Sequence, residues 1–100
     1  MQFTDMPKNL EILAEECAEV QLVKSKIIRF GWSDCHPNMP GITNRDRLEE
    51  ELGHVKAMIF ILEQNGYVTN AGMERAKKSK LEKLKIWYYH EADNVKAGQV

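Results

Sequence analysis

The sequence predicts an all-α protein of three helices. Six glycines and three prolines lie mostly near the breaks between three segments, and each segment carries apolar residues at helical spacing over about twenty residues. No internal repeat or low-complexity stretch interrupts this pattern. A chain of 100 residues allows one domain, so we expect residues 1–100 to form a single all-α domain.

Residues 7–30 are expected to form the first helix. Asp5 or Met6 would cap it, Pro7 suits its first turn because a proline there loses no hydrogen bond, and Gly31 would end it. At about 100° per residue, its apolar residues and one lysine share a broad arc, which two further apolar residues extend on one flank. The arc contains Leu10, Leu13, Ala14, Cys17, Val20, Lys24, Ile27 and Ile28, and the flank contains Ile12 and Val23.

A loop and a second helix follow. Residues 31–44 hold two glycines and two prolines among polar residues, which predicts a long loop, and loops of this length are often functional. Thr43 or Asn44 would cap a helix over 45–65, and Gly66 would stop it. The apolar arc of this helix contains Leu48, Leu52, Val55, Met58, Ile59 and Leu62.

The third helix is expected over 71–90, with Thr69 or Asn70 as its cap. Two lysines, Lys77 and Lys80, fall within its apolar stripe. The stripe contains Met73, Ala76, Leu81, Leu84, Trp87 and Tyr88. Three helices with broad apolar faces and no fourth helix predict association into a homodimer or homotetramer, while a monomeric three-helix bundle remains open.

Carboxylates lie on the core-facing stripes of the first two helices. Glu16 and Glu19 share one flank of the first helix at a spacing that lets their carboxylates converge. Glu51 falls inside the apolar arc of the second helix, and His54 lies at its edge. Because burial disfavours a lone carboxylate and neighbouring carboxylates repel, a positive charge must neutralise them.

Two sources of that charge are open. The first is a set of salt bridges, joining Glu51 to Lys80 or the glutamates to Lys24 or Arg29. The second is a hard divalent cation with oxygen ligands, which would neutralise all three carboxylates together. Mg²⁺ is the best candidate of this kind, because it accepts few protein carboxylates and completes its shell with water and phosphate oxygens.

The chain resembles the all-α nucleoside triphosphate pyrophosphohydrolases of the MazG-like group. That family carries E-E-x-x-E on one helix and E-x-x-D on the next. The first motif is complete at residues 15–19 (EECAE), and the second reads ELGH at 51–54, with His54 in place of the aspartate. The stretch between the motifs is longer than usual, which a loop insertion would explain. The resemblance covers residues 7–90 and extends to small bacteriophage-encoded members.

The resemblance implies a four-helix-bundle-like core completed by dimerisation. It also implies cleavage of a ribo- or deoxyribonucleoside triphosphate, with a standard or a modified base, into the monophosphate and pyrophosphate. The catalytic residues would be Glu15, Glu16, Glu19 and Glu51, and the metal ligands Glu16, Glu19, Glu51 and His54. Lys77, Lys80 and Lys83 would meet the phosphates, and Trp32 would stack on the base.

His54 leaves a second function open. A neutral imidazole is a poorer Mg²⁺ ligand than a carboxylate, so a site with His54 would favour Mn²⁺ or Co²⁺ relatively more. Such a site would turn over slowly. Alternatively, the chain would be a catalytically weak or inactive relative that binds nucleotides or regulates another protein.

Composition excludes several function classes. A net charge of −1 argues against duplex nucleic acid as a partner, and no apolar run is long enough for a membrane span. The N-terminus lacks the pattern of a signal peptide. With two cysteines and no short Cys-x-x-Cys spacing, we expect free thiols and a cytoplasmic protein, in the host cytoplasm if the source is a phage.

Overall fold

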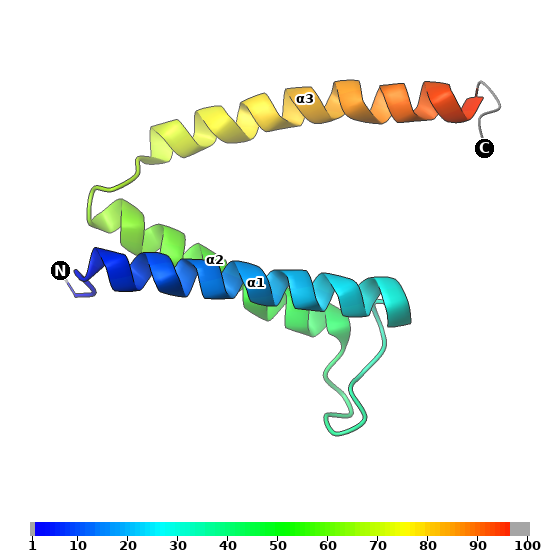
Figure 1. The fold of residues 1–100 in the computed structure, drawn as a ribbon, viewed down its shortest axis with the longest axis horizontal. Helices are drawn as coiled ribbons and strands as arrows, with labels where there is room; N and C mark the ends of the chain where they lie inside the picture. Colours follow the sequence, from blue (N-terminus) through cyan, green and yellow to red (C-terminus); the bar gives the residue numbers. More distant parts are fainter. Residues whose placement is uncertain (1, 97–100) are drawn as a thin grey trace. The chain divides into compact units, whose positions relative to one another are not determined.

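A computed structural model describes residues 2–96 as three α-helices, with no strand in that range (Figure 1). The helices are α1 (Met6–Phe30), α2 (Asn44–Gln64) and α3 (Asn70–Lys96). The expected all-α class is therefore confirmed. Helix α3 extends six residues beyond its expected end at residue 90.

The first helix begins and ends at the residues expected to bound it. The Asp5 side chain accepts a hydrogen bond from the backbone N–H of Lys8 at 3.1 Å, which satisfies one of the free donors of the first turn. Gly31, with φ of 97°, ends the helix and donates its N–H to the carbonyl of Ile27 at 2.7 Å. A side chain at that φ would be strained, so glycine suits the position.

Helix α2 begins at a reciprocal capping box. The Thr43 hydroxyl accepts from the Asp46 N–H at 3.1 Å, and the Asp46 carboxylate accepts from the Thr43 N–H at 2.9 Å. The hydrogen bond that the Thr43 N–H donates to the Asp46 carboxylate is the largest of the causes that lower the pKa of Asp46. After the helix ends, Gly66 adopts φ of 76°, the left-handed conformation that favours glycine.

The chain divides into two compact units, Met1–Tyr67 and Val68–Val100, which we describe separately. In the first unit, α1 and α2 run antiparallel and pack side by side (Figure 1). Their packed residues recur at alternating steps of three and four, as in a coiled-coil pair, and are all buried or half-buried. These residues, here called the seam, are Met6, Asn9, Leu13, Glu16, Val20, Val23 and Ile27 on α1, and Asn44, Leu48, Glu51, Val55, Met58 and Leu62 on α2.

Hydrogen bonds of Asn44 hold the loop between the two helices in place. Its side chain is buried and donates to the carbonyl of Gly31 at 2.9 Å, while its backbone N–H donates to the carbonyl of Asp34 at 2.9 Å. The next residue, Arg45, donates its N–H to the carbonyl of Trp32 at 3.1 Å. Both ends of the loop are therefore joined by hydrogen bonds, which fixes where α2 turns back along α1.

The buried face of α1 includes only part of the arc expected from its sequence. Leu13, Val20 and Ile27 of that arc belong to the seam. Its other apolar members, Leu10, Ala14, Cys17 and Ile28, are exposed, and the seam is shifted toward the flank that carries Val23. Because α1 carries apolar residues over more than one face, α2 covers only one of them. No helix in the described range has the length and apolar character needed to cross a membrane.

The second unit is formed by α3 after its connection from Tyr67. The Thr69 hydroxyl accepts from the N–H of Gly72 at 3.0 Å, so Thr69 caps the helix as expected. Met73 and Leu84 are half-buried within this unit. Further along, the rings of Trp87 and Tyr88 meet edge to face with centroids 4.9 Å apart.

Candidate metal centre

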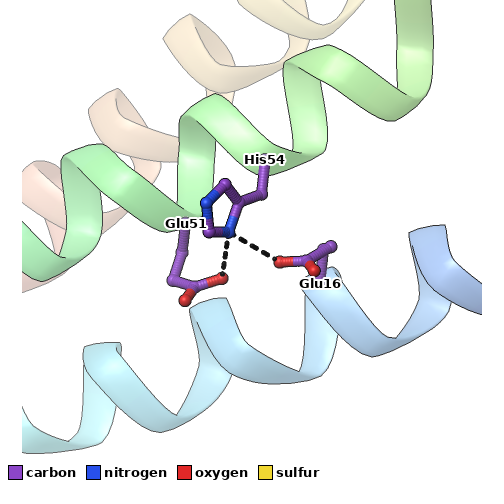
Figure 2. Close-up of side chains that lie close together, drawn as sticks. All are labelled: Glu16, Glu51 and His54. Atoms are coloured by element: carbon purple, nitrogen blue, oxygen red, sulfur yellow. Dashed lines mark hydrogen bonds and ion pairs between the residues drawn. The ribbon is translucent and has the colours of Figure 1, made fainter. Parts of the chain in front are cut away.

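Two carboxylates and an imidazole converge in the middle of the seam. Glu16 comes from α1, and Glu51 and His54 come from α2 (Figure 2). Each offers one ligand atom, and these atoms all lie within 4.8 Å of one another. The three residues, called here the Glu–Glu–His cluster, come from the two sequence motifs that predicted a metal site.

Helical spacing explains why these side chains meet. Glu16 and Glu51 occupy seam positions where the pattern otherwise places mostly apolar residues, so each carboxylate points toward the opposite helix. Their side chains retain only 24% and 18% exposure. His54 follows Glu51 by three residues and therefore lies beside it on α2. The seam thus holds two partly desolvated acids at its centre.

The imidazole of His54 is the basic partner of these two carboxylates. Its Nδ1 lies 3.1 Å from Glu16 Oε2, within hydrogen-bond distance, and 3.4 Å from Glu51 Oε2. Since Nδ1 carries at most one hydrogen, the closer Glu16 takes the hydrogen bond. Glu51 Oε2 is buried and has no hydrogen-bond partner among the described residues.

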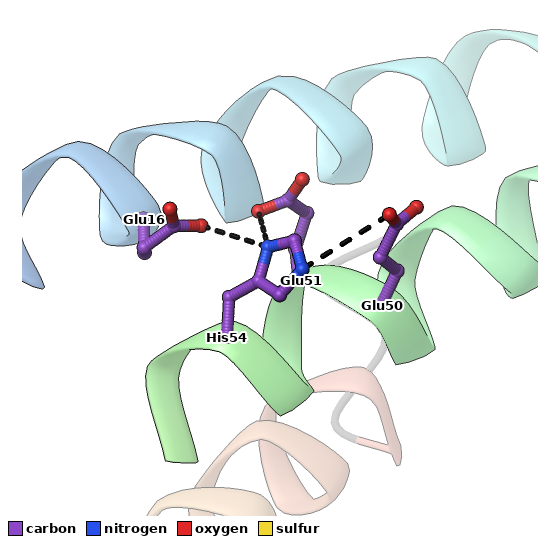
Figure 3. Close-up of polar contacts among 4 residues, drawn as sticks. All are labelled: Glu16, Glu50, Glu51 and His54. Carbon is purple, nitrogen blue, oxygen red and sulfur yellow. Dashed lines mark hydrogen bonds and ion pairs between the residues drawn. The ribbon is translucent and has the colours of Figure 1, made fainter. Parts of the chain in front are cut away.

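A third acid lies on the open side of the imidazole. Glu50 Oε1 is 4.0 Å from His54 Nε2, and its side chain is exposed (Figure 3). Glu50 was not expected at the site from the sequence. The spacing of four residues between Glu50 and His54 is the signal that could have revealed it.

The cluster holds protons more tightly than isolated side chains would. Desolvation, together with the hydrogen bond and charge of Glu16, raises the pKa of Glu51, against the opposing charge of His54. For His54, desolvation alone would lower the pKa, but the hydrogen bond of Glu16 and the charges of Glu16 and Glu51 outweigh it and raise the pKa above its ordinary value of 6.5. A cation entering the cluster would displace protons from these groups.

The residues present fit a divalent cation. Two carboxylate oxygens and one imidazole nitrogen form a mixed O/O/N donor set, which suits Mn²⁺ or Co²⁺ as well as Mg²⁺. A cation beside Glu51 would satisfy the buried Oε2, which otherwise lacks a hydrogen-bond donor. Within residues 2–67, the ion pairs of Glu16 and Glu51 come from His54, and none comes from Lys24 or Arg29.

The other two glutamates of the first motif lie outside the cluster. Glu19 is one turn along α1 from Glu16 and is exposed, and Glu15 is also exposed. The expected meeting of three glutamates is therefore found for Glu16 and Glu51, with His54 beside them, while Glu19 is not among the residues that converge.

The residues expected to bind substrate are all exposed. Trp32 retains 54% of its accessible surface near the start of the loop. On α3, Lys77 pairs with Glu74 at 3.4 Å, whereas Lys80 and Lys83 line a shallow hollow beside Trp87. The three lysines belong to the second unit, and their roles toward the cluster stay a prediction.

In metal-free buffer, the unfolding temperature should rise as the pH falls from about 8 to about 6. The raised pKa of His54 gives a stabilising contribution that is complete below its unfolded value of 6.5 and is lost as the pH rises through the higher folded value. The raised pKa of Glu51 contributes with the same sign, because the folded protein then takes up this proton more readily than the unfolded chain as the pH falls. Thermal unfolding with a chelator measures the profile.

The variant His54→Gln is the control for this profile, because it keeps a polar side chain but cannot titrate. Its unfolding temperature should depend less on pH across the same range. Equal pH dependence in the two proteins would show that His54 does not couple to folding.

Comparison with known proteins adds no relationship to this picture. Neither the models of protein families, nor the curated proteins, nor the solved structures include a match to the chain.

Proposed function

We propose that the chain is a metal-dependent pyrophosphohydrolase that converts a ribo- or deoxyribonucleoside triphosphate into the monophosphate and pyrophosphate, as MazG-like enzymes do. One observation carries the proposal. The first and second motifs, 35 residues apart from Glu16 to Glu51, deliver a carboxylate each to one point of the seam, where Glu51 Oε2 is buried without a hydrogen bond. A purely structural carboxylate buried in this way would be expected to accept a hydrogen bond, whereas Glu51 Oε2 has only the ion-pair distance of 3.4 Å to His54.

Glu16, Glu51 and His54 would hold the cation, Mg²⁺ or, given the imidazole, Mn²⁺ or Co²⁺. When bound, the ion would supply positive charge that offsets the charge of the phosphates and orients the attacking water. Glu19 is the further ligand that the family motif implies; it lies one turn from Glu16 on α1 and is exposed.

The remaining roles fall to exposed residues. Glu15 or Glu19 accepts the proton of the attacking water, because a carboxylate next to the cation site is a suitable general base. Lys77, Lys80 and Lys83 attract the phosphates as point charges. Trp32 offers an exposed ring for stacking on the base.

The same proposal includes self-association. Leu10, Cys17 and Ile28 form an exposed apolar face on α1, and Phe60 is exposed on α2. A homodimer or homotetramer would complete a four-helix bundle and cover these residues. Both cysteines, Cys17 and Cys35, are free thiols, which suits the proposed cytoplasmic location.

A second candidate function is nucleotide binding without cleavage. The observation that favours it is the ion pairing of His54 with both glutamates, which partly neutralises the cluster without a metal. A protein of this kind would bind a nucleotide and regulate its availability. The two candidates differ in whether pyrophosphate is released.

Release of pyrophosphate from a panel of ribo- and deoxyribonucleoside triphosphates, with Mg²⁺, Mn²⁺ or Co²⁺, tests the proposal. We expect release with at least one triphosphate, only in the presence of metal, together with a metal-induced rise in unfolding temperature. Nucleotide binding without release would favour the second candidate. If neither metal nor nucleotide changes the unfolding temperature, both functions are wrong.

A further inference from the structure

A second candidate site lies at the loop end of the helix pair, where a largely apolar cavity carries a few charged side chains. A cavity of about 400 Å³ opens between the end of α1, the loop and the start of α2. Small-molecule pockets commonly measure roughly 300–1,000 Å³, so the cavity has the size of a ligand site. Its charged lining consists of Lys26 from α1, Arg47 from α2 and Asp34 from the loop. None of the three residues of the Glu–Glu–His cluster lines it.

The two cations of this cavity lack acidic partners. Lys26 and Arg47 are both half-buried, and among residues 2–67 no ion pair involves either of them. Arg47 donates one N–H to the sulfur of Met39 at 2.9 Å, which is a weak acceptor. The other donors of its guanidinium group stay available. Half-buried cations from two helices that share one cavity favour an anionic ligand.

The rest of the lining permits such a ligand. Asp34 is the one acid on the wall, so the fixed charges of Lys26, Arg47 and Asp34 leave a net positive cavity. His36 Nδ1 accepts from the backbone N–H of Asn38 at 3.1 Å, which places the proton of a neutral ring on Nε2 as a further donor. The carboxyl end of α1 and the amino end of α2 both lie here, and the partial charges of their helix dipoles have opposite signs. The attraction for an anion therefore comes from the side chains.

Arg47 also connects the cavity to the metal cluster. It precedes Glu51 by four residues, which is about one helical turn and about 6 Å along α2, on the same face of the helix. A phosphate chain that leaves the cluster along this face would therefore reach Arg47. The guanidinium fork matches phosphate oxygens bidentately, and Lys26 faces the cavity from the opposite helix as a point charge.

We propose that Lys26 and Arg47 form a phosphate-binding pocket that holds one end of the substrate's phosphate chain beside the cluster. The inference rests on the proposed function only for the identity of the natural ligand, since the pocket binds phosphate through cations of the chain itself. It assigns phosphate recognition to the helix pair as well as to the lysines of α3.

Titration calorimetry with inorganic pyrophosphate and the full chain, in excess chelator, tests the pocket. We expect saturable binding by the wild type. Arg47→Gln and Lys26→Gln should each weaken it by about tenfold or more, because each removes a charge-assisted hydrogen bond. Arg47→Lys should lose less than Arg47→Gln, since it keeps the charge but loses the fork.

Matched controls separate the pocket from general charge attraction. Arg45→Gln and Lys24→Gln remove the same charge from exposed neighbours that do not line the cavity, and they should change the affinity less than about twofold. Glu51→Gln should bind pyrophosphate at least as well as the wild type, because no metal takes part. Absence of binding to the wild type, or equal losses in the controls, would overturn the proposal.

The pocket and the proposed function fail separately. The proposed reaction is measured as metal-dependent release of pyrophosphate, whereas the pocket is measured without metal and without a nucleotide. Pyrophosphate binding that depends on Arg47, without any turnover, would retain the pocket and remove the enzyme. Turnover in a protein whose metal-free form binds no pyrophosphate would retain the enzyme and remove the pocket.

Discussion

Replacing Glu51 with glutamine should abolish metal binding and reduce pyrophosphate release by at least about 100-fold. Even the outer-shell partners of metal ligands typically account for 10–100-fold effects, so loss of a direct ligand should cost at least as much. Glutamine keeps the shape of the side chain but removes the charge that attracts the cation. The unfolding temperature of the variant should no longer rise on addition of Mg²⁺ or Mn²⁺, as measured by thermal unfolding with and without metal.

Without metal, Glu51→Gln should unfold at the same temperature as the wild type or higher. The raised pKa of Glu51 shows that its folded surroundings, on balance, disfavour its charge, so removing the charge removes a cost. Glu49→Gln is the matched control, because Glu49 is exposed on the same helix and pairs with Arg45 at 3.4 Å, away from the cluster. It should keep both activity and the metal-induced shift. Strong destabilisation of metal-free Glu51→Gln would instead show that Glu51 serves an ion pair needed for folding.

The helix boundaries were predictable because local chemistry decides them. Asp5, Thr43 and Thr69 each accept a hydrogen bond from the first turn of the helix that follows, and Gly31 stops α1 through a backbone conformation that suits glycine. These signals act within four residues. The expected end of α3 at residue 90 rested on no such local signal, and the helix continues to Lys96.

The buried face of α1 was harder to predict, because its sequence carries apolar residues on more than one side. Leu10 and Ile28 were expected on the main arc, yet both are exposed, while Val23, expected on the flank, is buried. Periodicity shows that a helix is amphipathic but not which of two apolar faces meets a given partner. Pairing with α2 decides that choice.

The Glu–Glu–His cluster was predictable only in part. Glu51 and His54 share one face of α2 by spacing alone, and Glu16 could be assigned to a core-facing flank. Whether Glu16 or Glu19 meets them depends on how α1 is rotated and aligned against α2, which no local pattern specifies. The rotation that buries Val23 brings Glu16 into the seam and leaves Glu19 exposed.

Replacing His54 with aspartate should strengthen Mg²⁺ binding by about tenfold and raise pyrophosphate release with Mg²⁺. An anionic oxygen offsets more of the charge of a hard cation than a neutral nitrogen does. The wild type, by contrast, should prefer Mn²⁺ or Co²⁺ and lose activity as the pH falls through the raised pKa of His54, because a protonated imidazole cannot bind metal. Initial rates of both proteins across the three metals and across pH measure these differences.

The structure also predicts how His54→Asp changes the unfolding temperature. His54 Nδ1 lies 3.1 Å from Glu16 Oε2 and 3.4 Å from Glu51 Oε2, so aspartate would replace their positive partner with a third negative charge. The metal-free variant should therefore unfold at a lower temperature than the wild type, and Mg²⁺ should raise that temperature by more than it does in the wild type. His54→Asn removes the imidazole without adding charge, so it should gain neither tighter Mg²⁺ binding nor a larger shift. If His54→Asp and His54→Asn behave alike toward Mg²⁺, the side chain at this position does not bind the metal, and Glu16 and Glu51 hold it without a ligand from residue 54.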